Sequence, residues 1–154
     1  MSNTYTQLHI HCVFAVKYRA ALIHPSWEER LHKYITGIVT NNRHKLIAIN
    51  SVKDHLHMFM GLNPNQSLSE IMRLVKGDSA EFINKENITK NKFRWQEGYG
   101  AFSHSHSQID QVVKYIQNQK EHHTTKTFLT EYKNLLIDFG INYNENYIFS
   151  ELID

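Results

Sequence analysis

Apolar and polar residues alternate over the first part of the chain, between Tyr5 and Lys17. Side chains two positions apart point to the same side of a strand, so this period of two predicts a β-strand. Its apolar face consists of Leu8, Ile10, Cys12, Phe14 and Val16. Its polar face consists of Gln7, His9, His11 and Lys17. We therefore expect a first strand with one face in the core.

Two later segments have the period of a helix. The apolar stripe of the first, which follows His24-Pro25, consists of Trp27, Leu31, Tyr34, Ile35 and Ile38. In the second we expect burial of Leu68, Ile71, Val75 and Phe82. Each segment opens with the spacing of a capping box, at Ser26 and Glu29 and at Ser67 and Glu70. In such a box the serine accepts a backbone hydrogen bond that the first helical turn cannot satisfy, so we expect both helices to begin there.

Shorter apolar runs predict the remaining elements. We expect strands over residues 45–51 and 52–62, and one or two strands over 93–105 with a bend at Gly98-Tyr99-Gly100. Helices are expected over about residues 107–123 and over residues 127–139. The order β-α-β-β-α-β with right-handed crossovers predicts an α+β fold, a ferredoxin-like or RRM-like antiparallel sheet with additional C-terminal helices. The first and third strands should be neighbours at its centre, and one sheet face should stay open for a ligand or for those helices.

The composition is that of one soluble domain, and we expect residues 1–154 to form it. The chain has 41% hydrophobic residues and few glycines and prolines, which excludes long disordered segments. A net charge of +2 gives no strong basic tail for nucleic acid. The lone Cys12, the lack of a signal-peptide pattern and the lack of a membrane-length apolar run favour the cytoplasm. Eleven histidines are a clear excess.

Three of the histidine pairs have the spacing His-x-His. They are His55-Leu56-His57 in the third predicted strand, His9-Ile10-His11 in the first, and His104-Ser105-His106 near a helix start. Two imidazoles on one side of a strand make half of a metal site. A single such pair is more often a solvated polar face, and spacing alone does not choose among the three.

The helix expected over about residues 107–123 carries a second candidate group. Its apolar stripe consists of Ile109, Val112, Val113 and Ile116. Tyr115 and Gln119 lie one turn apart on the flank of that stripe, with His122 nearby. A tyrosine at such a boundary is usually a packing residue, so this pair alone is weak evidence for a functional site.

Several motifs in one order resemble those of the single-tyrosine HUH transposases of the insertion-sequence 200/605 group. The resemblance runs from about Tyr5 to Phe149. The motifs are Val16-Lys17-Tyr18-Arg19, Asp54-His55-Leu56-His57, Leu68-Ser69-Glu70-Ile71 with Leu74-Val75-Lys76-Gly77, Trp95-Gln96-Glu97-Gly98-Tyr99-Gly100-Ala101, and Tyr115-Ile116-Gln117-Asn118-Gln119 followed by His122-His123.

That resemblance implies a function and a site. It implies a DNA transposase that cleaves and rejoins single-stranded DNA at hairpin-bearing element ends through a 5′-phosphotyrosine on Tyr115. It implies a divalent ion, Mg²⁺ or Mn²⁺, held by His55, His57 and Gln119, and a homodimer. His9 and His11 would then be a second shell or bind DNA. The sequence offers no acidic third ligand to insist on, although Asp54 is adjacent and should point to the other face. Neither an organic cofactor nor a small-molecule substrate is expected.

Phosphate contacts are expected from basic side chains spread along the chain. The candidates are Lys17, Arg19, Lys53, Lys76, Arg94 and Lys114. Two other functions fit the sequence. One is a non-catalytic RRM-like domain that stacks bases on Tyr5, Phe59 and Phe93. The other is a domesticated relative that processes genomic repeat hairpins with the same chemistry.

Overall fold

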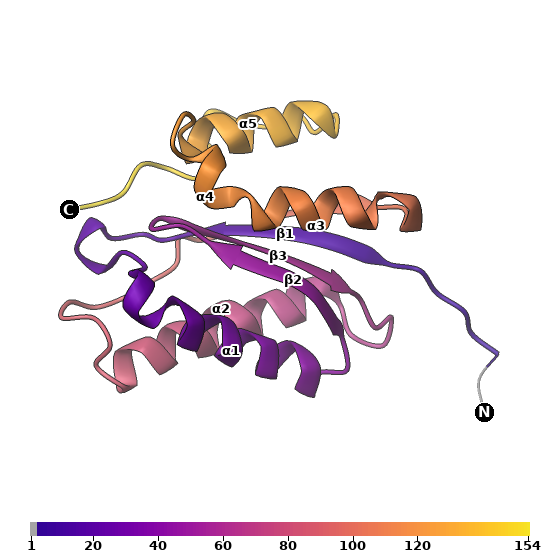
Figure 1. The fold of residues 1–154 in the computed structure, drawn as a ribbon, viewed down its shortest axis with the longest axis horizontal. Coiled ribbons are helices and arrows are strands. Elements are labelled where there is room, and N and C mark those ends of the chain that lie inside the picture. Colours follow the sequence, from indigo (N-terminus) through magenta and orange to yellow (C-terminus); the bar gives the residue numbers. More distant parts are fainter. Residues whose placement is uncertain (1–2) are drawn as a thin grey trace.

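A four-stranded antiparallel sheet forms the middle layer of the protein (Figure 1). The structure is a computed structural model that describes residues 3–154. The strands are β1 (His9–Ala15), β2 (Lys45–Ser51), β3 (His55–Gly61) and β4 (Gly100–His104). Their order in the sheet is β2-β3-β1-β4, so the first and third strands are the central pair, as predicted. The α+β fold expected from the sequence is confirmed.

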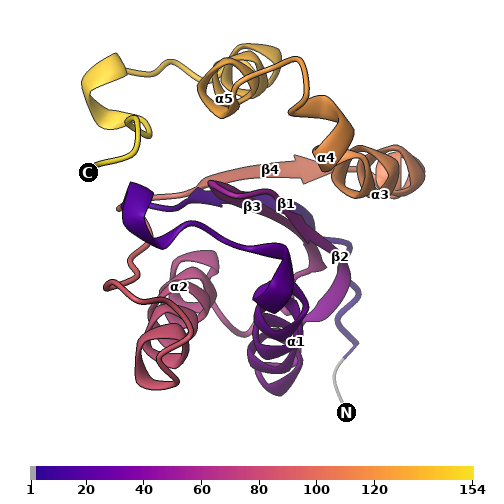
Figure 2. The ribbon, with the colours of Figure 1, turned by 60° about the vertical axis from the view of Figure 1, so that its left-hand side comes forward.

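Helices cover both faces of this sheet (Figures 1 and 2). The crossover helices α1 (Pro25–Asn41) and α2 (Leu68–Lys85) lie together on one face. On the other face lie α3 (Ile109–Gln117), α4 (Gln119–His122) and α5 (Phe128–Asp138). Short 3₁₀ turns are found at Arg19–Ala21, His106–Gln108 and Glu145–Tyr147. Among the described residues, no helix has the length and apolar character needed to cross a bilayer.

The main core lies between the sheet and the two crossover helices. Phe14 and Cys12 of β1 are fully buried there, against Leu31 and Ile35 of α1 and Val75 of α2. A second, smaller core lies on the opposite face, where Phe59 of β3 is packed under Val112 and Ile116 of α3. The C-terminal helices therefore occupy the sheet face that the sequence left open for them or for a ligand.

The two helix starts were not predicted equally well. Ser67 accepts a hydrogen bond from the backbone N–H of Glu70 at 3.1 Å, as its spacing predicted. The box at Ser26 and Glu29 was wrong, because the capping residue is His24. Its Nδ1 accepts from the backbone N–H of Ser26, and Pro25 occupies the first helical position, where no N–H is needed.

The apolar stripes also differ in detail from those predicted. Tyr34 is 36% exposed and stacks on the ring of Phe82 at 4.1 Å, so these two side chains cover the outside of the α1–α2 pair. Val39 is fully buried instead.

The helix expected over about residues 107–123 is interrupted at Asn118. The side-chain amide of Asn50, on β2, donates to the backbone carbonyls of Ile116 at 2.9 Å and Gln117 at 3.2 Å. Carbonyls in the last turn of a helix lack their usual i+4 partners, so Asn50 helps to satisfy them and fastens this end of α3 to the sheet. The next residue, Gln119, is fully buried.

Candidate metal centre and tyrosine

Strand β3 presents His55 and His57 to the sheet face that α3, α4 and α5 cover. Both side chains are fully buried. Their Nε2 atoms point to one region. There, Nε2 of His55 lies 3.2 Å from Oε1 of Gln119. Nε2 of His57 lies 3.2 Å from Oε1 of Glu131. The structure thus brings His55, His57 and Gln119 together, as the sequence predicted.

Glu131 of α5 is the carboxylate at the centre of this region. Its Oε1 lies 3.0 Å from Nε2 of His123 and 3.3 Å from Nε2 of His55. Its Oε2 accepts a hydrogen bond from the amide of Gln119 at 2.9 Å. Burial would raise the pKa of the Glu131 carboxyl, but hydrogen bonds from His123, His55 and His57 hold this pKa well below its usual range. Glu131 is therefore a buried negative charge surrounded by imidazoles.

Tyr115 reaches the same carboxylate from α3. Its hydroxyl donates to Oε2 of Glu131, and its ring lies edge-on to the ring of His57 at 5.8 Å between centroids. Burial and the neighbouring Glu131 charge raise the pKa of this phenol above its ordinary range. The tyrosine is therefore held as a protonated, oriented hydroxyl at the edge of the candidate metal centre.

Two further side chains hold the other nitrogens of the histidine pair. Oδ1 of Asp54 lies 2.7 Å from Nδ1 of His55. Nε2 of His11, on the neighbouring strand, lies 2.7 Å from Nδ1 of His57. Such outer contacts fix the tautomer and orientation of metal-binding imidazoles. The expectation that Asp54 points to the other face was wrong, because Asp54 belongs to the turn before β3 and strand alternation does not apply to it.

The remaining histidine pairs do not meet at this centre. His9 packs beside Phe59 and His106, and His104 lies against Phe59 and Phe139. His11 is thus the member of its pair that the structure brings to the site, where it contacts His57.

The donor set fits a divalent cation. A carboxylate only accepts hydrogen bonds, so Asp54 requires a proton on Nδ1 of His55. Without a second proton, Nε2 of His55 is a lone pair that faces oxygens of Gln119 and Glu131, which also accept. The carbonyl of Lys126 likewise requires a proton on Nδ1 of His123, which lies 2.7 Å from it. Such acceptor-to-acceptor contacts need a positive charge between them, either a proton or a metal ion.

Three candidate metal-binding side chains lie close together. Nε2 of His55, Nε2 of His57 and an oxygen of Glu131 lie within 4.8 Å of one another. Two imidazole nitrogens and two oxygens, from Glu131 and Gln119, form a mixed set that suits Mn²⁺ and, through the oxygens, Mg²⁺. Glu131 is a candidate acidic ligand that sequence reasoning missed. A signal existed in the sequence, because Glu131 shares the apolar face of its helix with Phe128, Tyr132 and Leu135.

The candidate phosphate-binding residues lie in different surroundings. Lys76 donates to the carbonyls of Gln96 and Gly98, and burial lowers its pKa to about 8. Its ammonium group therefore binds the protein's own backbone. Arg19 pairs with Asp154 at 2.8 Å. Lys17 lies over the ring of Tyr18. Arg94 and Lys114 are exposed, whereas Lys53 lines a pocket beside the candidate metal centre.

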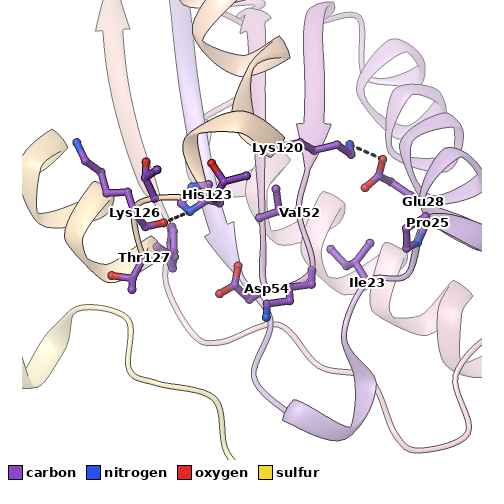
Figure 3. A pocket seen from close by; sticks show the side chains of 13 residues that line it. Ile23, Pro25, Glu28, Val52, Asp54, Lys120, His123, Lys126 and Thr127 are labelled. Atoms are coloured by element: carbon purple, nitrogen blue, oxygen red, sulfur yellow. Dashed lines mark hydrogen bonds and ion pairs between the residues drawn. The ribbon is translucent and has the colours of Figure 1, made fainter.

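This pocket has a volume of about 660 Å³ (Figure 3). Asp54, His123 and Phe128 line it and also contact His55. Two lysines that sequence reasoning missed, Lys120 and Lys126, line it as well.

A platform for base stacking is not present on the sheet. Phe59 and Phe93 are fully buried, the first under α3 and the second against Trp27 and Trp95. Tyr5 is 94% exposed but precedes β1. The alternative of an RRM-like domain with stacking residues at these positions was therefore wrong.

Comparison with known proteins agrees with this geometry. The family described as "Transposase IS200 like" matches residues 4–119, three quarters of the chain. This protein belongs to that family. The match includes His55, His57, Tyr115 and Gln119 but ends before α5, so Glu131 lies outside it.

Individual relatives share modest identity with this IS200-like transposase. The ISDra2 transposase TnpA of Deinococcus radiodurans is 24% identical over 120 residues, which cover 75% of this chain and 86% of the relative. A crystal structure from Deinococcus radiodurans R1, described as that of a candidate transposase, superposes with a TM-score of 0.62 at 23% identity. It covers 77% of this chain and 95% of its own.

A second solved structure shares the fold at lower identity. It is that of a REP-associated tyrosine transposase bound to a REP hairpin, with a TM-score of 0.59 and 14% identity. The alignment covers 80% of this chain and 73% of that one. At these identities the two structures support the fold, while the family match establishes the transposase assignment.

Proposed function

We propose that this IS200-like transposase cleaves and rejoins single-stranded DNA through a covalent bond between Tyr115 and a 5′ phosphate. The observation that carries the proposal is the contact between the Tyr115 hydroxyl and Glu131, whose carboxylate also meets His55 and His57. A nucleophile therefore lies directly beside a candidate site for a divalent ion. We expect residues 1–154 to act as one domain in the cytoplasm.

In this proposal His55, His57 and Gln119 hold the ion, and Glu131 is an additional ligand. The ion is Mg²⁺ or Mn²⁺, and when bound it offsets the negative charge that develops on the phosphate oxygens during attack. His11 and Asp54 keep the two imidazoles in the orientation and tautomer that ligation needs.

The protein's own groups carry out the rest of the reaction. The Tyr115 oxygen forms a bond to phosphorus as the bond to the 3′ oxygen breaks, the phenol gives up its proton and the leaving 3′ oxygen gains one. Glu131 orients the phenol through their hydrogen bond. The phosphotyrosine retains the energy of the broken bond, so a later 3′-hydroxyl can rejoin strands without ATP. Burial of the site slows competing attack by water.

The substrate is proposed from the family and from the shared fold. We expect single-stranded DNA with hairpins near the ends of a mobile element, and a homodimer as the working form. A relative that processes genomic repeat hairpins would use the same groups. Imperfect palindromes beside the coding region of a mobile element would favour the first of these roles.

The test is the formation of a denaturant-resistant adduct with single-stranded DNA that carries candidate element ends, in Mn²⁺ or Mg²⁺. We expect the adduct with wild-type protein and its loss in Tyr115→Phe, because the reacting oxygen is removed. Tyr99→Phe is the matched control and should keep the adduct. His55→Ala or His57→Ala should abolish cleavage while hairpin binding persists.

Two results would contradict the assignment. An adduct that survives Tyr115→Phe would place the nucleophile elsewhere. If His9→Ala and His11→Ala together abolish cleavage while His55→Ala and His57→Ala retain it, the other histidine pair holds the ion.

A further inference from the structure

The pocket beside the candidate metal centre has walls from three separate segments (Figure 3). They are the entry to α1 with Ile23 and Glu28, the turn at residues 52–54, and residues 120–128 around the link from α4 to α5. Its volume of about 660 Å³ lies within the range of about 300–1,000 Å³ that is common for small-ligand sites. One nucleotide fits a space of this size.

The charges in the pocket leave two lysines without a carboxylate. Glu28 accepts from Lys120 at 2.9 Å and from the hydroxyl of Ser51 at 3.0 Å. Asp54 pairs with His55 at 2.7 Å. Within residues 3–154, neither Lys53 nor Lys126 forms an ion pair. Among these residues, both ammonium groups therefore lack a carboxylate partner.

The pocket also has an apolar part. Ile23, Val52 and Phe128 contribute to its lining, and Ile23 and Phe128 are almost fully buried. Figure 3 shows Ile23 and Val52 between the Glu28–Lys120 pair and the turn that holds Asp54. A flat aromatic base gains from contact with such surface, whereas a free inorganic anion does not.

Lys126 connects this pocket with the tyrosine. A second cavity, of about 320 Å³, is lined by Tyr115, Glu131 and His122, and Lys126 lines it too. The two cavities thus share Lys126 as a lining residue. A DNA strand whose phosphate lies at Tyr115 can continue past Lys126 into the larger pocket.

We propose that the larger pocket binds the nucleotide of single-stranded DNA next to the phosphate that Tyr115 attacks. Lys53 and Lys126 bind its phosphate, and Ile23, Val52 and Phe128 contact its base. The position along the strand rests on the proposed function, but the binding itself needs no cleavage. Lys126 is the residue that joins the nucleophile to this subsite.

The first experiment measures binding of a fluorescent twelve-nucleotide thymidine strand as a function of salt, in a Tyr115→Phe background. Each phosphate contact on a single strand contributes about 0.7 to the slope of log affinity against log salt. The double variant Lys53→Gln/Lys126→Gln should therefore lose about 1.4 from the size of that slope, for two contacts. The double variant Lys33→Gln/Lys92→Gln removes the same charge from other surfaces and should change affinity less.

A second experiment locates the bound strand directly. The same oligonucleotide, with 5-iododeoxyuridine at one position, is photo-crosslinked to the protein, and the modified peptides are identified by mass spectrometry. We expect attachment within residues 120–128 or 52–54. Attachment confined to other segments, or equal salt slopes for the two double variants, would overturn the proposal.

These outcomes are separable from those of the adduct assay. Loss of the adduct in Tyr115→Phe together with equal salt slopes would support the proposed cleavage chemistry and contradict the nucleotide subsite. Crosslinks in the pocket together with an adduct that survives Tyr115→Phe would support the subsite and contradict the assignment of Tyr115 as the nucleophile.

Discussion

Each imidazole near Glu131 has its second nitrogen engaged by a different partner. His55 uses Asp54, His57 uses His11, and His123 uses the carbonyl of Lys126, each at 2.7 Å. An imidazole nitrogen binds a metal only as a lone pair, so the partner of one nitrogen decides what the other can do. Because burial and neighbouring His55 lower the pKa of His57 to about 4, this ring is held in the neutral form that ligation requires.

The contact between His11 and His57 gives a test at a single side chain. His11→Phe keeps an aromatic ring in the buried position but leaves Nδ1 of His57 without a partner. We expect Mn²⁺ affinity to fall by about 10–100-fold, the usual cost of losing such an outer contact. Isothermal titration calorimetry measures this affinity, and thermal unfolding checks that the variant is folded.

The matched control is His9→Phe, in the same strand and on the same face. His9 lies beside Phe59 and His106 rather than beside the candidate metal-binding pair, so Mn²⁺ affinity should stay near that of the wild type. Equal losses in the two variants would show that the His11 contact has no special role.

Helix α5 supplies the part of the site that lies beyond the family match. Phe128 stacks on His55 at 4.1 Å, Glu131 enters the centre, and Tyr132 is buried against Phe128 and Phe149. The start of β4 allows this close packing, because a Cβ atom at Gly100 would lie 2.6 Å from the ring of Tyr132. Glycine at this position thus lets α5 approach the sheet.

Two glycine substitutions should change the free energy of unfolding in opposite directions. Gly100→Ala should lower the free energy of unfolding by about 1–3 kcal/mol, because the buried Tyr132 ring must move. Gly77→Ala should raise it by about 0.5–1 kcal/mol, since Gly77 lies inside α2 with open space around it. Urea unfolding measures both changes. A stable Gly100→Ala variant would mean that α5 packs less closely than described.

A single chain brings Tyr115 and the candidate metal-binding residues together. Tyr115 and His57 belong to opposite sides of one interface, between the C-terminal helices and the sheet, and their rings lie 5.8 Å apart. The resemblance implies a homodimer, commonly one in which the tyrosine helix completes the partner's site. This geometry favours a tyrosine that serves its own chain.

Mixing inactive variants distinguishes the two arrangements. Tyr115→Phe and His57→Ala chains, co-expressed so that mixed dimers form, should give no adduct if each site uses its own tyrosine. Restored adduct formation would show that the tyrosine helix completes the partner's site. Wild-type chains mixed with Tyr115→Phe chains serve as the control and should stay active.

Local patterns in the sequence were enough to predict the elements, their order in the sheet and part of the site. A period of two places His55 and His57 on one side of β3 whatever packs above them. The family motifs then distinguished this pair from His9 and His11, which spacing alone could not do. Tyr115 and Gln119 were found through one helical turn, although α3 ends between them.

The tertiary structure was needed for the contacts that no local period encodes. Glu131, His123 and Lys126 reach the site because α5 folds back over the sheet, and Asp54 does so because a turn frees it from strand alternation. These contacts join residues far apart in the chain, or turn residues without a period. Their positions depend on how whole helices pack against the sheet. That packing results from many weak interactions together, so no local pattern in the sequence predicts it.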